Sequence, residues 1–268
     1  MTERVIINLD ADGNATVALN RPEVHNAFDP AMVQQLTAAL KKLEKNPQVR
    51  AVVLTAVGKN FSAGADIGHM RASAKFSRAQ NEAAAREMAG MFQTLYALKK
   101  PTIAAVRGAV RGGGTGLVAA CDIAIGTRET NFRLTEVRLG ILPAMISPYV
   151  VGAIGARQAH RYFLSGEEID AAEAWRIGLL HEICEDTDLG ARVGAMLGDL
   201  YLGGPAAIVA AKQAIRDVRD KAVTPAIVNA TAKNIAKVRA TKEAQEGLSA
   251  FLEKRQPAWT VPASKKRK

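Results

Sequence analysis

The stretch of this chain best suited to chemistry is a run of glycines in GAVRGGGTGLVAACD, residues 108–122. Gly112, Gly113 and Gly114 are consecutive, and Gly116 follows just before an apolar segment with helical character. Glycine lets a ligand approach the backbone closely, and the first N–H groups of a helix carry positive potential. Such amides can bind a phosphate, or an oxyanion that forms during a reaction.

The nucleotide-binding and hydrolase motifs do not fit this run. A phosphate loop of the form G-x-x-x-x-G-K-[ST] needs lysine where Gly114 stands, and without it nothing reaches the terminal phosphates. The dinucleotide pattern G-x-G-x-x-G, read from Gly112, fails at Leu117. The G-x-S-x-G elbow of serine hydrolases is absent.

A second glycine-bearing loop offers a partner for the first. The loop NFSAGADIGHM, residues 60–70, follows the apolar segment AVVLTAV, residues 51–57. One backbone amide from each loop could converge on a single oxygen and form an oxyanion hole. On spacing alone, two tight turns without chemistry are an equal alternative.

The elements that position these loops alternate along the chain. Apolar runs predict strands, and helical spacing of apolar residues with start and stop signals predicts helices. The predicted strands are 4–10, 15–20, 51–57, 102–108 and 123–126. The predicted helices are 28–46, 86–100, the segment from the glycine run to residue 121, and 206–220, 225–240 and 242–255, with helical character from about residue 145. This alternation predicts an α/β architecture with crossover connections.

Composition narrows the functional classes. Hydrophobic residues form 48% of the 268 residues, which is enough for the core of one α/β domain with or without an appendage. The net charge of +10 favours anionic partners. Two cysteines and four scattered histidines match no metal site, so we expect no metal. The charged, strand-like N-terminus and the lack of a long apolar run predict a cytoplasmic protein that neither carries a signal peptide nor enters a membrane.

Five motifs in this order and spacing resemble the crotonase family of enoyl-CoA hydratases and isomerases. The resemblance covers residues 4–260. Within the family, the motifs most resemble those of the bacterial methylglutaconyl-CoA hydratase branch of leucine and acyclic-terpene catabolism. The motifs are NRPEVHNAF, FSAGADI, RGAVRGGGTGLVAACDIAI, TEVRLGILP and EGLSAFLEKRQPAW.

This resemblance implies a fold and an assembly. Residues 1–203 would form a ClpP-like spiral of ββα repeats, and 204–260 a C-terminal helical region that mediates trimerisation. Residues 261–268 would be a basic, disordered tail. A homotrimer, or a hexamer built as a dimer of trimers, would be the assembly.

The resemblance also implies a site for an acyl-CoA thioester. The amides of Ala65 and Gly113 would form the oxyanion hole, and Glu136 would be a catalytic carboxylate. No cofactor is implied, because CoA is part of the substrate. Phe251 and Lys254 would reach the CoA of a neighbouring subunit. The residues implied in substrate binding are Val24, His25, Ala63, Asp66, Ile67, Gly68, Gly112, Phe251 and Lys254.

The chain departs from the family at two positions. Gly116 stands where hydratases of the family have a second catalytic glutamate, and Gly68 stands where many relatives have a lysine. We therefore expect Glu136 to be the sole general acid and base of a hydratase, with 3-methylglutaconyl-CoA or a related branched ester as substrate. A Δ3-Δ2 enoyl-CoA isomerase that uses the same glutamate is the alternative.

Three further points concern ligands. A distal carboxylate on the substrate would need a cation, and the candidates by sequence position are His69, Arg71, Arg111 and Arg138. The methionines 70, 88, 91 and 145 are expected in the core. An RNA-binding or non-catalytic crotonase-like protein is the alternative of another class. The charge permits RNA, but aromatic residues are only 5% and no base-stacking motif is present, so we do not expect nucleic acid as a partner.

Overall fold

The computed structural model describes residues 3–260, and its main feature is a six-stranded sheet with strand order β1-β2-β3-β4-β6-β9. The pair β1–β2 is an antiparallel hairpin, and the later pairs are parallel. A second sheet has the order β5-β7-β8. The strands are β1 (Val5–Leu9), β2 (Asn14–Leu19), β3 (Ala51–Ala56), β4 (Thr102–Val106), β5 (Ala109–Arg111), β6 (Ile123–Thr127), β7 (Asn131–Arg133), β8 (Glu168–Asp170) and β9 (Glu182–Cys184).

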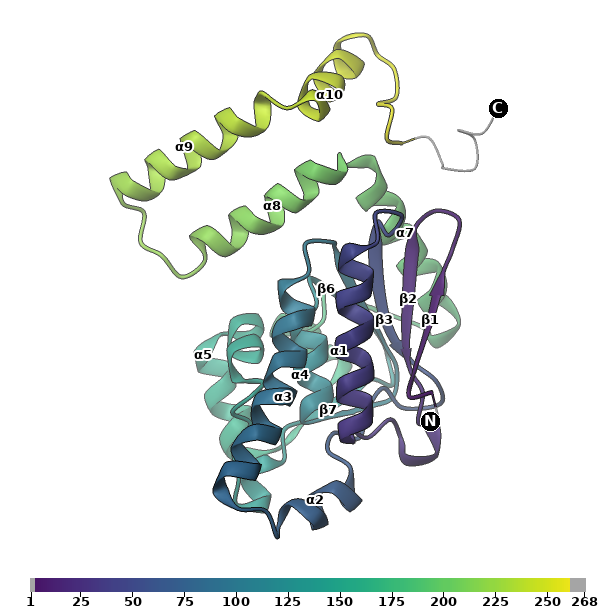
Figure 1. Ribbon diagram of the computed structural model, residues 1–268, viewed down its shortest axis with the longest axis vertical. Coiled ribbons are helices and arrows are strands. Elements are labelled where there is room, and N and C mark those ends of the chain that lie inside the picture. Colours follow the sequence, from purple (N-terminus) through teal and green to yellow (C-terminus); the bar gives the residue numbers. More distant parts are fainter. Residues whose placement is uncertain (1–2, 261–268) are drawn as a thin grey trace.

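Helices cover both faces of the larger sheet. Helices α1 and α3 lie side by side over one face, and α7 packs against the other (Figure 1). The helices are α1 (Pro30–Lys45), α2 (Ile67–Ser73), α3 (Arg78–Ala97), α4 (Gly113–Ala120), α5 (Ser147–Ser165), α6 (Ala171–Arg176), α7 (Leu189–Leu202), α8 (Pro205–Val218), α9 (Pro225–Arg239) and α10 (Lys242–Leu252). Three 3-10 helices are η1 (Pro22–Val24), η2 (Glu136–Leu139) and η3 (Asp186–Asp188).

The unbroken apolar runs of the central strands follow from this two-sided cover. Side chains alternate across a strand, so neighbouring residues enter different layers. In β3, Val52 and Leu54 join the core on the α1 and α3 side, whereas Ala51 and Val53 join the cluster beneath α7. The predicted α/β architecture with buried parallel strands is confirmed.

Helix α1 shows how local signals set an element. Asp29 precedes it, and its carboxylate accepts a hydrogen bond from the Met32 N–H at 2.8 Å, while Pro30 occupies the first turn. Leu36 and Leu40 then recur at helical spacing and are fully buried.

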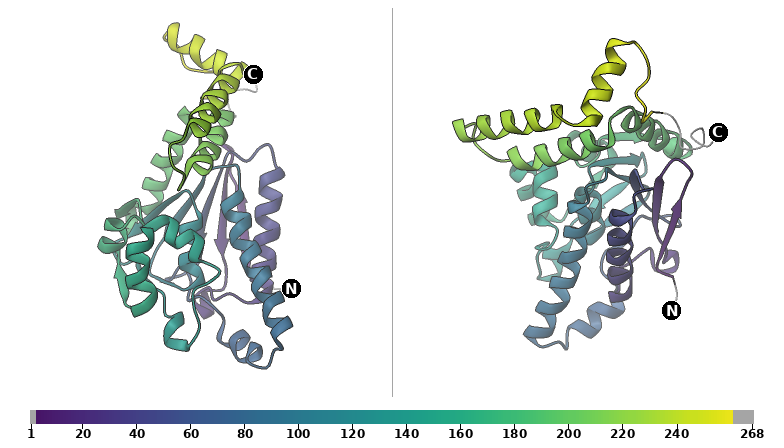
Figure 2. Two further views of the ribbon diagram at one scale, coloured as in Figure 1. Left: turned by 90° about the vertical axis from the view of Figure 1, so that its left-hand side faces the viewer. Right: turned by 45° about the horizontal axis from the view of Figure 1, so that its top comes forward.

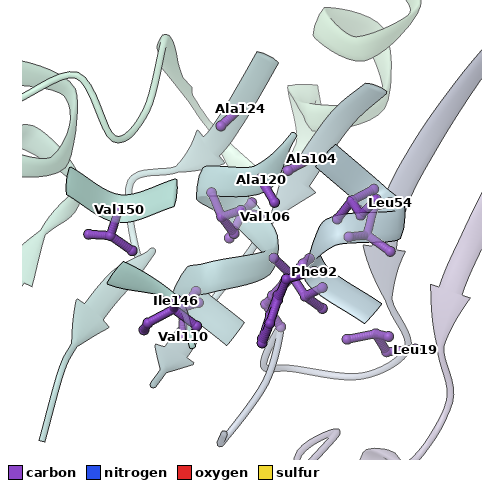
Figure 3. Packing of buried hydrophobic residues seen from close by; sticks show 14 of the residues in the cluster. Leu19, Leu54, Phe92, Ala104, Val106, Val110, Ala120, Ala124, Ile146 and Val150 are labelled. Atoms are coloured by element: carbon purple, nitrogen blue, oxygen red, sulfur yellow. The ribbon is translucent and has the colours of Figure 1, made fainter. Parts of the chain in front are cut away.

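The short helix α4, which begins inside the glycine run, lies in the middle of the core. It packs between α3 and α5, and all but one of its side chains from residue 114 onward are buried. Figure 3 shows Phe92 of α3 in the same packed cluster as Val106, Val110 and Ile146. Interiors of this density leave little freedom for α4 to shift, so the first residues of α4 are held firmly.

The three C-terminal helices extend beyond one end of the sheet (Figures 1 and 2). Lys212 of α8 fastens them to the core, because its ammonium donates to the Asp122 carboxylate at 2.5 Å and to the Lys100 carbonyl at 3.0 Å. No residue of α9 is buried, and α10 buries only Ala250. Large apolar side chains exposed on this region are Ile215, Val218, Val223, Val228, Ile235, Leu248, Phe251 and Leu252.

The structure corrects three expectations about the elements. Residues after 145 are not all helical, because β8 and β9 lie among the helices, and the second sheet was not predicted. Strands of three residues are too short to show a period. Helix α3 begins at Arg78 rather than at residue 86, because Ser77 and Gln80 form a capping box ahead of a polar first half.

Among residues 3–260, no single helix combines the length and apolar composition needed to cross a membrane. One sharply bent pair of segments, Asp186–Leu202 and Pro205–Val218, reaches that length and composition only when the two are taken together. The predicted basic tail, residues 261–268, lies outside the described residues. Helix α7 ends at Leu202 and α8 begins at Pro205, which is where the predicted boundary between core and helical region falls.

Candidate active site

Backbone hydrogen bonds hold the two glycine-bearing loops side by side. Ser62 pairs with Val110 of β5 in a parallel bridge. The Ser62 N–H donates to the Ala109 carbonyl at 3.2 Å, and the Arg111 N–H donates to the Ser62 carbonyl at 2.9 Å. The first loop therefore runs alongside the strand that leads into the glycine run, as the converging-loop hypothesis requires.

The amide of Ala65 faces away from its neighbouring strand segment. Ala65 and Phe28 form a parallel bridge in which the Phe28 N–H donates to the Gly64 carbonyl and the Asp66 N–H donates to the Phe28 carbonyl. In a parallel bridge this pattern turns the N–H of the residue between them to the opposite side. No acceptor for the Ala65 N–H is found among the described residues.

Gly113 supplies the second amide. It is the first residue of α4, so its N–H precedes the hydrogen-bonded ladder of the helix and has no partner within it. Gly112, the preceding residue, is fixed by its own N–H, which donates to the Arg133 carbonyl at 3.0 Å. The dipole of α4 adds positive potential at this point.

The first two glycines of the run are required by close approaches within the site. Gly112 has φ +45°, and a Cβ there would lie 2.9 Å from Oε1 of Glu136. A Cβ on Gly113 would lie 2.8 Å from the ring of Phe28. Any larger residue at either position would thus displace the carboxylate or the ring.

The later glycines of the run face the core. A Cβ on Gly114 would lie 2.9 Å from the Ser62 side chain, which belongs to the first loop. A Cβ on Gly116 would lie 2.2 Å from Cγ2 of Ile146 and 3.1 Å from the ring of Phe92. Gly116, where the family has a second glutamate, therefore has no room for a side chain in this fold.

Glu136 lines the same cavity as Ala65 and Gly113. It begins the 3-10 helix η2, and its backbone carbonyl accepts the N–H of Ile141, which bends the chain around it. Its Oε2 is buried and accepts no hydrogen bond from any group among residues 3–260. Burial raises the pKa of Glu136, against a smaller lowering effect of its own backbone N–H. A partly buried carboxylate without a fixed partner is suited to accept and return protons.

These groups converge on one cavity of about 180 Å³. Its lining is mostly apolar, with Glu136 as its one carboxylate among the described residues. The lining residues are Phe28, Ala63, Gly64, Ala65, Met70, Met88, Phe92, Arg111, Gly112, Gly113, Thr135, Glu136, Leu139, Ile141, Leu142, Pro143, Ala144, Met145 and Ile146.

The methionines divide differently from the expectation. Met91 is fully buried in the core, as predicted. Met88 and Met145 pack partly against the core and also line the cavity, and Met70 lines it without joining the core cluster. Flexible thioether side chains adapt to irregular pockets, so three of the four contribute to the surface of the site.

Asp66 holds the first loop in place. Its carboxylate accepts from the His69 N–H at 3.1 Å, which caps α2, and from Arg21 at 2.9 Å. Arg21 is 8% exposed and also pairs with Asp29 at 3.4 Å. Burial acts to raise the pKa of Asp66, but the His69 N–H and Arg21 outweigh it, so the pKa lies below its usual value. Asp66, adjacent to Ala65, thus fixes the loop that carries the amide.

Val24 and His25, predicted to bind CoA, lie beside the same loop. The His25 carbonyl accepts the N–H of Ala63 at 2.8 Å, and its ring nitrogen Nδ1 lies 3.1 Å from the Asn60 amide nitrogen. His25 and Ala63 are exposed, and Val24 is half-buried. The fold therefore brings this predicted group together with the first loop.

Ile67 and Gly68 continue the chain from Asp66 into the start of α2. Both are exposed, and the Ile67 side chain is 68% exposed. No side chain is present at Gly68 to replace the lysine of its relatives. This end of the site offers apolar surface and backbone rather than a cation.

Phe251 and Lys254 are not brought to the cavity within one chain. Both lie at the end of α10, at the opposite end of the molecule from α2 (Figure 1). Phe251 is 80% exposed, and Lys254 is held at φ +55°. A role for them at a CoA site would therefore require another copy of the chain.

Of the predicted cations, Arg111 alone lines the cavity. Its guanidinium donates to the backbone carbonyl of Asn131 at 2.9 Å and to the Asn131 side chain at 2.5 Å, and lies 3.6 Å from Glu168. The lining does not include the other candidates, which are His69, Arg71 and Arg138.

Sequence reasoning missed the apolar part of the lining. Phe28 was quoted within a motif without a role, and Phe92 and Ile146 were not singled out. Phe92 and Ile146 come from α3 and the start of α5, far from both loops in sequence. No spacing signal in one sequence would have joined them to the glycine run.

Comparisons with known proteins identify the family and the fold. The family described as enoyl-CoA hydratase/isomerase matches residues 11–262. The crystal structure of an enoyl-CoA hydratase from Shewanella pealeana superposes with a TM-score of 0.93 at 39% identity, covering 96% of each chain.

Two curated proteins have comparable identity over nearly the whole chain. The 2,3-dehydroadipyl-CoA hydratase of Escherichia coli K12 is 31% identical over 243 residues, which is 90% of this chain and 92% of that protein. The short-chain-enoyl-CoA hydratase of Clostridium acetobutylicum is 30% identical over 255 residues, covering 92% and 94%. The fold implied by the motifs is confirmed.

Proposed function

The chain belongs to the enoyl-CoA hydratase/isomerase family, and from this membership we propose that it adds water across the double bond of an α,β-unsaturated acyl-CoA. The observation that carries the proposal is the convergence, on one apolar cavity, of a partly buried carboxylate and two backbone amides without partners among the described residues. Such an arrangement is suited to a reaction in which negative charge develops on a carbonyl oxygen while a proton is transferred nearby.

The amides of Ala65 and Gly113 would bind the thioester carbonyl oxygen. As water attacks Cβ, the π electrons move toward Cα and the carbonyl, and the oxygen takes on enolate charge. Donors that are already oriented stabilise this charge without reorganisation, and one donor of this kind contributes about 2.7–4 kcal/mol to transition-state stabilisation.

Glu136 would perform both proton transfers. Its carboxylate takes a proton from the attacking water as the new C–O bond forms at Cβ, and the resulting carboxylic acid then gives a proton to Cα. The electron pair of the former double bond forms the new Cα–H bond, and Glu136 ends ionised. The raised pKa of Glu136 favours the first of these transfers, because a base of higher pKa accepts a proton more readily.

Substitution Glu136→Gln tests this assignment. Glutamine has nearly the same size but cannot take a proton, so we expect kcat for hydration to fall about 10²–10⁴-fold with little change in acyl-CoA affinity. Glu129→Gln, an exposed position away from the cavity, is the matched control. Wild-type turnover in Glu136→Gln would contradict the mechanism.

A Δ3-Δ2 isomerase is a second candidate, because a single carboxylate suffices for a 1,3-proton shift and Glu136 is the only one that lines the cavity among the described residues. Mass spectrometry separates the two reactions. A product heavier by one water supports the hydratase, whereas turnover of a 3-enoyl-CoA without mass change supports the isomerase.

For the acyl group, we propose a short, branched chain, with 3-methylglutaconyl-CoA as the first substrate to test. The support is the motif resemblance, the size of the cavity, and Arg111 at its lining. Because Arg111 already engages Asn131 and Glu168, a distal carboxylate would compete with Glu168 for it. Comparing 3-methylglutaconyl-CoA with 3-methylcrotonyl-CoA, which lacks that carboxylate, measures its contribution, and Arg111→Met should abolish any preference for the acidic ester.

The assembly and location are part of the same proposal. We propose a homotrimer or hexamer in the cytoplasm, formed through the exposed apolar face of α9 and α10, in which Phe251 and Lys254 approach the CoA of a neighbouring copy. Light scattering measures the oligomer. Phe251→Ser with Lys254→Ser should raise KM for the acyl-CoA without lowering kcat if this contact exists.

A further inference from the structure

The position of Gly116 is closed by two side chains that also line the acyl cavity. A Cβ at residue 116 would lie 2.2 Å from Cγ2 and 2.8 Å from Cβ of Ile146, and 3.1 Å from the Phe92 ring. The φ of Gly116 is outside the left-handed region, so the backbone alone would accept any residue. Glycine is needed at 116 because of Ile146, and equally Ile146 fits only because residue 116 has no side chain.

Ile146 and Phe92 together form a continuous apolar surface, here named the Ile146–Phe92 wall. They are 3% and 0% exposed, and both contribute to the cavity lining, whereas Gly116 does not. Figure 3 shows both within one packed cluster. The wall therefore stands between α4 and the cavity, so a side chain that started at residue 116 would have to pass through it to reach a substrate.

We propose that Ile146 is a specificity-determining residue. Its side chain separates Gly116 from the cavity and forms the apolar end of the acyl pocket. Because Ile146 fills the volume beside Gly116, no glutamate side chain fits at residue 116, and Glu136 is left as the single catalytic carboxylate. Ile146 also limits the length of the acyl group, because the cavity of about 180 Å³ closes against the wall. The inference rests on the proposed function in one respect, namely that this cavity holds the acyl chain.

Binding of saturated acyl-CoA esters tests selectivity without chemistry, because they have no double bond to hydrate. Dissociation constants for butyryl-, hexanoyl- and octanoyl-CoA would be measured by calorimetry for wild type, Ile146→Ala and Ile154→Ala. Ile154 is the matched control, because it is an isoleucine of α5, the helix that Ile146 immediately precedes, is 6% exposed, and does not line the cavity.

We expect wild type to prefer butyryl-CoA. Ile146→Ala should raise the affinity for octanoyl-CoA relative to butyryl-CoA by about tenfold or more, since methylene groups in an apolar pocket discriminate by ~10–200-fold. Ile154→Ala should lose stability but keep the wild-type ratio. An unchanged ratio in folded Ile146→Ala, or an equal shift in Ile154→Ala, would overturn the proposal.

The interlock between Gly116 and Ile146 has its own test in a double-mutant cycle of melting temperatures. Gly116→Ala should lower Tm strongly in wild type and much less in the Ile146→Ala background, where the 2.2 Å contact with Cγ2 is gone. If Gly116→Ala alone yields no folded protein while the double variant folds, the interlock is equally supported. Equal losses in both backgrounds would contradict it.

The outcomes separate this inference from the hydratase proposal. If wild type binds the esters and Ile146→Ala shifts the selectivity, but wild type hydrates no enoyl-CoA, the hydratase proposal alone is contradicted. Wild type that hydrates a short enoyl-CoA while Ile146→Ala leaves selectivity unchanged would contradict the role of Ile146 alone.

Discussion

Replacing Gly112 by alanine tests whether the glycine run sets the position of the catalytic carboxylate. The new Cβ would lie 2.9 Å from Oε1 and 3.6 Å from the carboxyl carbon of Glu136, so that carboxylate must move. Gly112 also has φ +45° and ψ −113°, a conformation in which L side chains are strained. Relaxing this strain would rotate the peptide that carries the Gly113 N–H.

The two effects have different magnitudes and different readouts. The backbone strain should cost about 1–3 kcal/mol of stability, which corresponds to a fall in Tm of roughly 2–12 °C for a domain of this size. Displacing Glu136 and turning the Gly113 amide affects a proton-transfer group and an oxyanion donor together. Since loss of either contributes about 10²-fold or more, kcat for hydration should fall at least ~10²-fold.

A control separates strain from contact. Gly155, at the kink of α5, has φ +74° and ψ 157°, and a Cβ there would meet no atom within 4 Å. Gly155→Ala should therefore lower Tm by a comparable amount and leave kcat near the wild-type value. Stopped-flow or absorbance assays of enoyl-CoA hydration at saturating substrate measure kcat at a temperature where both variants are folded. If folded Gly112→Ala keeps wild-type kcat, the glycine run does not position Glu136.

Three further predictions concern charge. Because burial raises the pKa of Glu136 and the base must be ionised to accept a proton, the acid limb of a kcat/KM pH profile should have its midpoint above 4.5, the ordinary glutamate value; a midpoint at or below it would contradict the assignment. Arg21→Met should remove the fixed partner of Asp66 and loosen the loop that carries the oxyanion amide. We expect kcat to fall about 10-fold or more, with partial rescue in Arg21→Lys. An unchanged kcat would show that the hydrogen bond of Asp66 at the start of α2 is enough to hold the loop. Lys212→Met leaves Asp122 without its ammonium partner. Because the Asp122 side chain is 30% exposed, the free energy of unfolding should fall by about 1.5–3 kcal/mol, the range for a hydrogen bond to a charged group and below that of a fully buried pair. Chemical unfolding measures the loss, with Lys233→Met on the exposed α9 as control.

Much of the fold was predictable because its signals are local. The continuous apolar runs of β3 and β4 indicated strands covered on both faces, and the alternating contacts of Val52 and Val53 bear this out. Asp29 with Pro30 predicted the start of α1. These signals act over one or two turns of chain, which a single sequence displays directly.

The site was predictable only where it coincides with such signals. The two glycine loops were visible, and the fold joins them through Ser62 and Val110 as expected. The reason for each glycine was not visible, because the groups that require it, such as Phe28 and Ile146, come from other parts of the chain. A close approach between distant segments leaves no periodic trace in the sequence.

In the proposed mechanism Glu136 serves alone where the motif resemblance implies two glutamates, and the geometry around it is consistent with that role. Oε1 lies against Gly112, one residue before the Gly113 amide, so the proton-transfer group adjoins the oxyanion donor. Oε2 is buried and accepts no hydrogen bond among residues 3–260, so no protein group competes for the negative charge of this oxygen. A group that takes a proton in the first step holds the proton needed in the second, so no second acid is required.

The same reasoning applies to hydration and to a double-bond shift, since in the proposed mechanism both would begin with proton transfer to Glu136 beside a thioester bound by the amides of Ala65 and Gly113. The absence of a side chain at Gly116 therefore cannot decide between the reactions. In hydration the carboxylate takes its proton from water as oxygen bonds to Cβ and gives a proton to Cα, whereas in the double-bond shift it takes the proton from Cα and gives it to Cγ. For this site the mass of the product, rather than a count of carboxylates, is the quantity that distinguishes a hydratase from an isomerase.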